Sequence, residues 1–296
     1  MQRLLAFALV GLIAQLVDGA LGMAYGVTSS SLLLLYGLAP AAASASVHLA
    51  ETITTAVSGL AHWRMGNWHR PTVRGLVLPG AVGAFLGAVL LASLPAERVR
   101  PVVAGFLLVL GVYILVRFTL AAMPRHRRPP RLRLRYVMPL GFVAGLLDAT
   151  GGGGWGPIAT PALMVRGDLP PHQVVGSVSI AEFAVAVSAT LGFALTLGWE
   201  GVAWLQVAAL VAGGAVAAPL AAWMARRLPA QVLGVMVGTA VLLVNLRTLF
   251  GAAGITGLTR LLAYALVAAV CLGLLVQAAL RSRRQAASQV QHPATD

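Results

Sequence analysis

The sequence predicts an all-α integral membrane protein made of two homologous, inverted repeats. Of its 296 residues, 59% are hydrophobic and only 10% are charged, whereas a soluble domain carries roughly 25% charged residues. So few charges do not cover a soluble globule of this size, and the apolar surface must therefore face lipid. The mean hydropathy of +0.87 agrees with this conclusion.

Arginine supplies the positive charge of the chain. There are 21 basic residues, none of them lysine, against 8 acidic residues. A net charge of +13 would also suit a nucleic-acid-binding protein,. However, the arginines lie between apolar runs, where they act as topology signals of a multi-pass protein. We therefore expect no nucleic-acid partner. The single Cys271 excludes a disulfide framework,, and we expect no cofactor and no metal ion.

Apolar runs, most of them near the 20 or so residues that a spanning helix needs, follow one another along the chain. The first repeat, 1–122, holds runs at 4–17, 22–37, 41–61, 72–93 and 98–122. The second repeat, 137–250, holds runs at 137–147, 154–165, 171–197, 201–225 and 229–250. A basic cytoplasmic linker at 123–136 separates them, and an additional transmembrane helix at 257–280 precedes a cytoplasmic tail at 281–296.

The two halves of the chain repeat each other. Asp18 lines up with Asp148, Glu51 lines up with Glu182, and one Leu-Pro-Ala segment lines up with another. The landmarks keep their order while the offset drifts only from 130 to 134 residues. Chance similarity between apolar segments does not align acidic residues in this way, so we infer a duplication.

The arginines also discriminate between two topologies. If 4–37 and 137–165 are re-entrant hairpins, each half has three full spans and the halves are inverted. If 4–37 crosses the membrane once, each half has four spans and the halves are parallel. In the first case about 16 arginines lie on the inner side of the membrane and about 5 on the outer side. In the second case the numbers are about 13 and about 8. The positive-inside rule favours the inverted arrangement, in which a broken or re-entrant first helix precedes three transmembrane helices.

Two glycine-rich breaks, 18–26 and 148–157, occupy corresponding places in the two halves. Paired interrupted helices indicate the binding site of a transporter, because each half-helix that restarts after a break points unsatisfied N–H groups at a cavity. The alternative is that the glycines only allow close helix packing. The expected substrate-binding residues are Gly22, Tyr25, Gly26, Ser29, Ser30, Gly152, Gly153, Gly154, Trp155, Thr160, Asn245 and Arg247.

Four acidic residues lie inside apolar runs: Asp18, Glu51, Asp148 and Glu182. Ionisable groups at membrane depth are costly and usually mark a pathway or a proton relay. His48 lies three residues before Glu51 and so on the same helix face,. We expect these five residues to couple transport to protons. Two structural alternatives stay open, in which some of the acids cap a half-helix and His48 is a packing residue.

Structural roles are also open for other candidates. Serine and threonine in apolar helices often donate to the carbonyl of the preceding turn, and Arg247 can extend to the membrane interface. The segment 62–70 is rich in aromatic and basic residues. It indicates an interfacial anchor, with gating as the alternative.

Two halves that each open with G-x-x-x-x-x-x-D before a glycine-rich break, followed by an S-V-x-x-x-E helix, resemble the TauE/SafE family of sulfite and organosulfonate exporters. The resemblance covers about residues 5–280. It implies a multi-pass carrier in the bacterial inner (plasma) membrane that moves small anions such as sulfite, sulfoacetate or other short organosulfonates. The first glycine-rich motif departs from the second, with Leu21, Met23 and Ala24 opposite Gly151, Gly153 and Gly154.

We therefore expect a secondary transporter for small sulfur-containing anions that works by alternating access around a midplane site at the two breaks. The alternative is a proton- or cation-coupled carrier of a neutral or cationic small solute. No ATP-binding, serine-nucleophile or zinc-protease motif is present in the sequence, so we expect no enzyme and no catalytic residue. The expected partners are a small anionic substrate and the lipid bilayer. Small residues such as Gly80, Gly83 and Gly87 suit either a homodimer interface or packing inside the monomer,.

Overall fold

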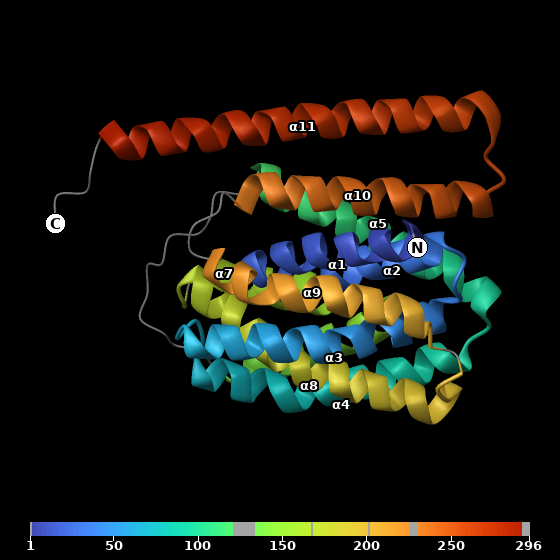
Figure 1. The fold of residues 1–296 in the computed structure, drawn as a ribbon, viewed down its shortest axis with the longest axis horizontal. Helices are drawn as coiled ribbons and strands as arrows, with labels where there is room; N and C mark the ends of the chain where they lie inside the picture. Colours follow the sequence, from blue (N-terminus) through green and yellow to red (C-terminus); the bar gives the residue numbers. More distant parts are fainter. Residues whose placement is uncertain (1, 121–133, 167, 201, 225–229, 292–296) are drawn as a thin grey trace.

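The computed structural model describes residues 2–120, 134–166, 168–200, 202–224 and 230–291. Within these ranges every regular element is an α-helix, which confirms the all-α prediction. Most of the helices lie side by side along one long axis (Figure 1), as expected of a membrane bundle in which backbone groups must be paired within each helix.

The helices follow the predicted apolar runs closely. The first half comprises α1 (Gln2–Leu21), α2 (Tyr25–Leu35), α3 (Pro40–Arg64), α4 (Arg70–Ser93) and α5 (Ala96–Leu120). The second half comprises α6 (Leu134–Gly151), α7 (Trp155–Arg166), α8 (Pro171–Leu197), α9 (Trp204–Met224) and α10 (Ala230–Ala252). A further helix, α11 (Gly257–Gln291), follows. Most of the predicted linker 123–136 lies outside the described residues.

Six of the described helices, α1, α4, α5, α8, α9 and α11, are long and apolar enough to cross a membrane. This agrees with a multi-pass membrane protein. Helix α3 has 25 residues but is less apolar, because it carries many hydroxyl side chains, two histidines and a glutamate among its buried residues.

Both interrupted segments turn back at their breaks. In the first, the ring of Phe7 near the start of α1 lies 4.9 Å from the ring of Tyr36 just after α2. In the second, the start of α6 packs on Gly75 at the start of α4. Its end leads into α8, where Gly176 contacts Asn67 in the loop before α4. Each segment therefore returns to the end of the bundle where it began.

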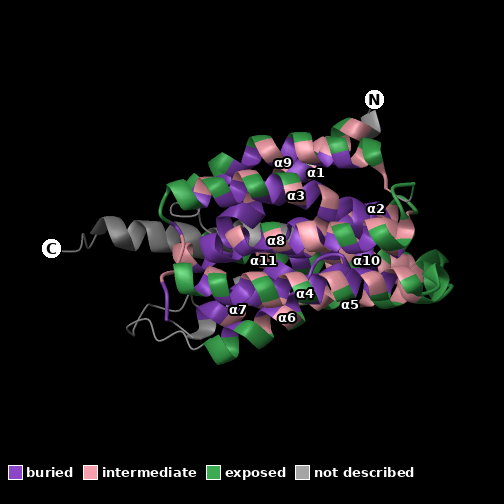
Figure 2. Ribbon diagram, turned by 90° about the horizontal axis from the view of Figure 1, so that it is seen from below, coloured by how far each residue is buried: buried purple, intermediate pink, exposed green. Residues whose placement is uncertain are grey.

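Glycines bring the helices into backbone contact. A Cβ at Gly83 of α4 would lie 2.2 Å from the carbonyl oxygen of Phe142 in α6, and one at Gly213 of α9 would lie 1.9 Å from that of Ala8 in α1. Gly80 and Gly87 likewise face residues of this chain. These small residues therefore serve packing inside the bundle, whose inner faces are buried in Figure 2.

Helix α11 stands at the edge of the bundle and packs mainly against α10 (Figure 1). Only 11% of its most apolar window, within Gly257–Ala278, is buried. The helix continues as one element to Gln291, beyond residue 280, where the sequence suggested that a tail begins.

Candidate functional site

The two glycine-rich breaks meet inside the bundle, backbone against backbone. A Cβ at Gly153 would lie 2.2 Å from the backbone nitrogen of Val27, and a Cβ at Gly26 would lie 2.9 Å from the Cα of Gly153. Gly152 and Gly153 have φ angles of 73° and 153°, which side chains rarely tolerate. The sequence therefore needs glycine here for both close approach and backbone conformation.

A hydroxyl from each hairpin holds the break of the other. Ser30 of α2 donates to the carbonyl of Gly152, and Thr160 of α7 donates to the carbonyl of Gly22. Both side chains are buried. The carbonyls at a break have lost their helical partners, so these two bonds tie the hairpin tips together.

Other hydroxyls have different surroundings. Ser44 of α3 donates to the carbonyl of Ala149 over 2.9 Å, so a third hydroxyl joins the two halves near the second break. Ser31 donates back to the carbonyl of Val27 over 2.6 Å, the local role that apolar helices favour,. The predicted Ser29 is buried, and its hydroxyl has no hydrogen-bonding partner among the described residues.

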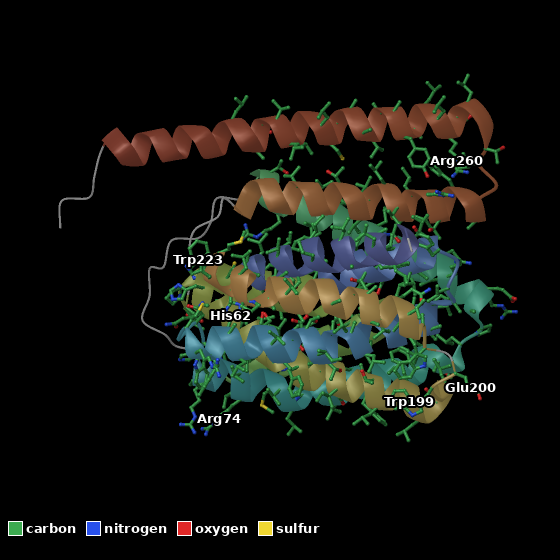
Figure 3. The ribbon with its side chains drawn as sticks, viewed as in Figure 1. His62, Arg74, Trp199, Glu200, Trp223 and Arg260 are labelled. Atoms are coloured by element: carbon green, nitrogen blue, oxygen red, sulfur yellow. The ribbon has the colours of Figure 1, made fainter. Side chains whose placement is uncertain are left out.

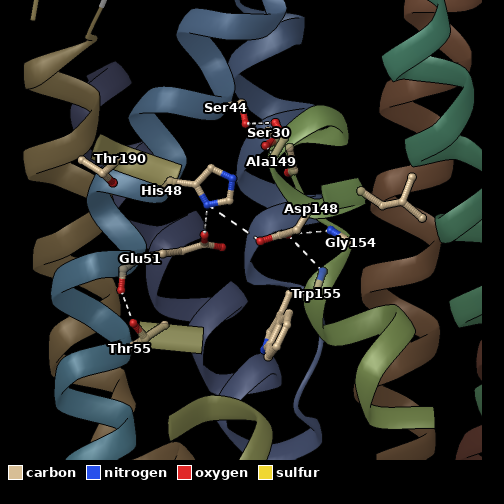
Figure 4. Close-up of polar contacts among 12 residues, drawn as sticks. Ser30, Ser44, His48, Glu51, Thr55, Asp148, Ala149, Gly154, Trp155 and Thr190 are labelled. Atoms are coloured by element: carbon tan, nitrogen blue, oxygen red, sulfur yellow. Dashed lines mark hydrogen bonds and ion pairs between the residues drawn. The ribbon is translucent and has the colours of Figure 1, made fainter. Parts of the chain in front are cut away.

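Asp148 caps the half-helix that restarts after the second break. Its Oδ1 accepts hydrogen bonds from the backbone N–H of Gly154 at 2.7 Å and of Trp155 at 3.0 Å (Figure 4). These are two of the free N–H groups expected at a helix start. The indole of Trp155 is buried and donates to the carbonyl of Val178 over 3.1 Å. The side chain of Asp148 therefore occupies the start of α7, the position where the sequence analysis expected the substrate anion.

His48 joins two carboxylates beside this cap. Its Nδ1 lies 2.9 Å from Oε2 of Glu51 and 3.9 Å from Oδ2 of Asp148 (Figure 4). The three residues are at most 3% exposed, and the ring of His48 stacks on Phe193 of α8 with centroids 6.1 Å apart. One ligand atom from each of the three lies within 4.8 Å of the others. Such a set can hold protons or a cation.

Two further acids complete the group. Asp18 is buried and its carboxylate is hydrogen-bonded to the backbone of Tyr25, at the start of α2. Glu182 of α8 is 5% exposed and lies close enough to interact electrostatically with the other three carboxyl groups. We call Asp18, His48, Glu51, Asp148 and Glu182 the acid cluster. The fold brings together all five residues expected to couple transport to protons.

Tyr25 also lies at this cluster. Its ring is buried, and its hydroxyl donates to the carbonyl of Leu210 in α9 over 3.3 Å. A Cβ at Gly26 would lie 3.0 Å from Oε1 of Glu51. The first break therefore contacts the cluster directly, through Gly26 and Tyr25.

The two predicted residues of α10 separate from each other. Asn245 is buried and donates to the hydroxyl of Ser31 over 2.6 Å, so it packs on α2 near the first break. Arg247 is exposed and lines a cavity of about 540 Å³ between α2, α5 and α10. The same cavity holds Arg100, which donates to the carbonyl of Leu34 at the end of α2 over 2.7 Å. Arg247 is therefore a residue of the bundle surface.

The sequence interpretation missed the burial of His62. This side chain is 0% exposed, and its Nε2 lies 3.0 Å from the carbonyl oxygen of Gly19. The signal was the spacing of polar residues along α3, which repeats every three or four positions from Glu51 to His62. By contrast, His69 lies outside α3 and hydrogen-bonds Thr72 over 2.9 Å. Partial burial lowers the pKa of His69 below its ordinary value.

Comparison with known proteins gives consistent results. A family model described as "Sulfite exporter TauE/SafE" matches residues 7–248. The chain is 54% identical over 250 residues to the probable membrane transporter protein YtnM of Bacillus subtilis (strain 168), an alignment that covers 84% of this chain and 83% of YtnM. It is 31% identical over 149 residues to the probable membrane transporter protein YdhB of the same organism, covering 49% of this chain and 60% of YdhB. No solved structure matches the chain.

Proposed function

The chain belongs to the TauE/SafE family of membrane transporters, and on that premise we propose that it is a proton-coupled secondary carrier of small sulfur-containing anions. Sulfite, sulfoacetate and other short organosulfonates are the candidate substrates. The family description names sulfite. We place the carrier in the bacterial inner membrane.

The observation that carries this proposal is the acid cluster at the meeting point of the two breaks. Four carboxyl groups and an imidazole lie together, all at most 5% exposed. Ionisable residues at membrane depth are expensive and mark substrate pathways or proton relays. Here they lie against irregular backbone, which membrane proteins tolerate only inside protein or beside a cavity.

Electrostatic repulsion would couple binding of the anion to protonation of the acid cluster. No arginine is among the buried polar residues of the described part of the chain, so the cluster offers little fixed positive charge. An anion that approaches ionised carboxylates is repelled, and this repulsion is strong where the dielectric constant is low. Binding of the anion and binding of protons to the cluster therefore favour each other. This mutual preference is what proton-coupled transport requires.

Alternating access is the mechanism that we propose for movement. The reciprocal bonds of Ser30 and Thr160 support two equivalent hairpins related by an inverted repeat, as do the similar packing of α1 on α9 and of α6 on α4. Rocking one half against the other around a midplane site would expose the breaks to each side in turn.

A second function has one specific observation in its favour. The ligand atoms of His48, Glu51 and Asp148 lie within 4.8 Å of one another, a geometry that can hold a cation. Under this reading the carrier couples a cation to a neutral or cationic solute, and the carboxylates are ligands instead of proton carriers.

Transport by the purified protein in liposomes tests both functions. Labelled sulfite, sulfoacetate and taurine are offered with and without an imposed pH gradient. We expect one of them to accumulate under the gradient, and this accumulation to be lost in Asp148→Asn and Glu182→Gln but kept in Glu97→Gln, which changes an exposed acid. Flat traces for every sulfur anion, together with cation-dependent uptake of another solute, would support the second function instead.

A further inference from the structure

A stripe of polar side chains runs along one face of α3, from the acid cluster toward the end of the bundle where α4 begins. It consists of Glu51, Thr55, Ser58 and His62, at spacings of three and four residues that place them on one helix face,. All four are at most 2% exposed. The rise of about 1.5 Å per residue puts His62 roughly 16 Å from Glu51 along the helix axis. We call these residues the α3 stripe.

A polar side chain from α1 faces the stripe. A Cβ at Gly19 of α1 would lie 3.6 Å from both Nε2 of Gln15 and Oγ of Ser58, so these two side chains share the space between α1 and α3. From α8, the backbone carbonyl of Ser179 approaches Gly59, the residue after Ser58. All three side chains are buried.

Several of these buried groups are unpaired. Within the described chain, the hydroxyls of Ser58 and Ser179 and both polar atoms of Gln15 have no hydrogen-bonding partner in the protein. Buried polar groups are normally paired, and those without a protein partner are paired by internal water. Thr55 donates to the carbonyl of Glu51 in its own helix, whereas Gln15 and Ser58, which meet at Gly19 between Glu51 and His62, have no such partner. These unpaired groups therefore favour water molecules between the acid cluster and His62.

The ring of His62 is oriented with one nitrogen toward each side. Its Nε2 lies 3.0 Å from the carbonyl oxygen of Gly19. A carbonyl only accepts, so Nε2 carries the proton and donates it toward the Gln15 side. Its Nδ1 lies 3.4 Å from Nδ2 of Asn67, in the loop after α3, and accepts from it. A neutral imidazole in this orientation has the lone pair of Nδ1 toward Asn67 at the end of the bundle and its N–H toward the cluster,.

Groups from three neighbouring helices surround His62. An ionisable side chain that acts on it is His172 of α8. Helix α1 contributes the carbonyl of Gly19, and α9 contributes the carbonyl of Ala222, which accepts from Asn67 over 3.5 Å. Figure 3 shows His62 at the same end of the bundle as Arg74 and Trp223.

We propose that the α3 stripe is a hydrated proton pathway between the acid cluster and this end of the bundle, and that His62 is its terminal proton carrier. A proton from the solution at this end of the bundle binds Nδ1 in place of the hydrogen bond from Asn67 and gives the imidazolium. Nε2 then releases its proton to water beside Gln15 and Ser58. One proton enters and one leaves. A flip of the neutral ring then turns its N–H back toward the cluster and its lone pair back toward the end of the bundle. This pathway deepens the proposed function, on whose proton coupling it rests.

Cysteine labelling tests the hydration of the pathway and needs no substrate. In a Cys271→Ser background, Ser58→Cys is compared with Leu60→Cys, a position two residues away that is 47% exposed on the outer face of α3. A charged methanethiosulfonate reagent needs water and an ionised thiol. We expect Ser58→Cys to react at least about tenfold faster than the lipid-facing control, because a thiol in apolar surroundings stays protonated. Equal or slower reaction would mean a dry stripe and overturn the proposal.

Two transport modes of the reconstituted protein test the role of His62. Counterflow exchanges labelled for unlabelled anion without net proton movement, whereas accumulation under a pH gradient requires it. His62→Gln keeps a hydrogen-bond donor for Gly19 but cannot carry a proton. We expect accumulation to fall at least about tenfold while counterflow stays within about twofold, and His69→Gln to leave both modes intact. Equal loss of both modes, or loss of neither, would overturn the role of His62.

The two proposals fail in different ways. If the unmodified protein neither exchanges nor accumulates any sulfur anion, the proposed function is wrong, and the labelling of Ser58→Cys alone decides whether the pathway exists. If transport is intact but Ser58→Cys is unreactive, the carrier stands and the pathway is wrong.

Discussion

Replacing Gly153 with alanine tests the contact between the two breaks. A Cβ at this position would lie 2.2 Å from the backbone nitrogen of Val27 and 2.5 Å from the carbonyl carbon of Gly26, whereas real Cβ contacts essentially never fall below 3.0 Å. The hairpin tips must therefore separate by at least 0.8 Å, the difference between 3.0 and 2.2 Å. Neither partner atom belongs to a flexible side chain that can move aside.

Two costs add in this variant. Overpacking of a close-packed interior costs about 1–3 kcal/mol. A side chain at the φ of 153° adds strain of about 1–3 kcal/mol. Since a domain of this size loses roughly 2–4 °C in unfolding temperature for each kcal/mol, we expect Gly153→Ala to lower the unfolding temperature by roughly 5 °C or more.

The unfolding temperature of the detergent-solubilised protein is the measurement, because it needs no knowledge of the substrate. Gly105→Ala on α5 is the matched control, since a Cβ there meets nothing within 4 Å. Gly26→Ala should lie between the two, because its Cβ would be 2.9 Å from the Cα of Gly153. If Gly153→Ala and Gly105→Ala have the same unfolding temperature, the backbone contact between the breaks does not exist as described.

Three further outcomes are expected in the same melting assay. Ala24→Gly should raise the unfolding temperature, because the φ of 119° at Ala24 costs about 1–3 kcal/mol in a residue with a side chain; a lower temperature would contradict this. Asp148→Ala should destabilise by about 0.5–2 kcal/mol through the lost helix cap, whereas Asp148→Asn keeps an acceptor oxygen and should melt close to the unmodified protein; equal melting of the two variants would argue against the cap. Ser30→Ala and Thr160→Ala should each cost about 1 kcal/mol, and the double variant should depart from additivity because both bonds hold the same pair of tips; strictly additive costs would mean that the tips are independent.

Sequence reasoning reached the acid cluster because its residues carry a strong local signal. A carboxylate inside an apolar run is expensive, and the alignment of Glu51 with Glu182 marked both as members of one site. The same reasoning identified Ser30 and Thr160 but left open whether they donate to their own helices. Only the fold shows that each donates to a carbonyl of the opposite break.

Sequence reasoning was less successful for residues whose surroundings depend on the direction in which the side chain points. Asn245 and Arg247 are two positions apart on one helix, so their side chains point about 200° apart around its axis. One is buried against Ser31 and the other is exposed. His62 looked like part of an interfacial anchor because its neighbours in sequence are aromatic and basic. Its burial follows from the packing of α8 and α9 against α3, which the aromatic and basic neighbours of His62 do not reveal.

The sequence by itself determined the environment, the helices and the breaks of this protein. Hydropathy, arginine distribution and glycine spacing are properties of short segments, and a lipid bilayer admits few structures that satisfy the backbone of such segments. The tertiary structure alone decided that Asp148 lies 3.9 Å from His48, that Thr160 donates to the carbonyl of Gly22, and that the tips of the hairpins touch. These contacts join residues up to 138 positions apart. They exist because glycine lets the backbones approach and because buried polar groups must find partners wherever the fold supplies them.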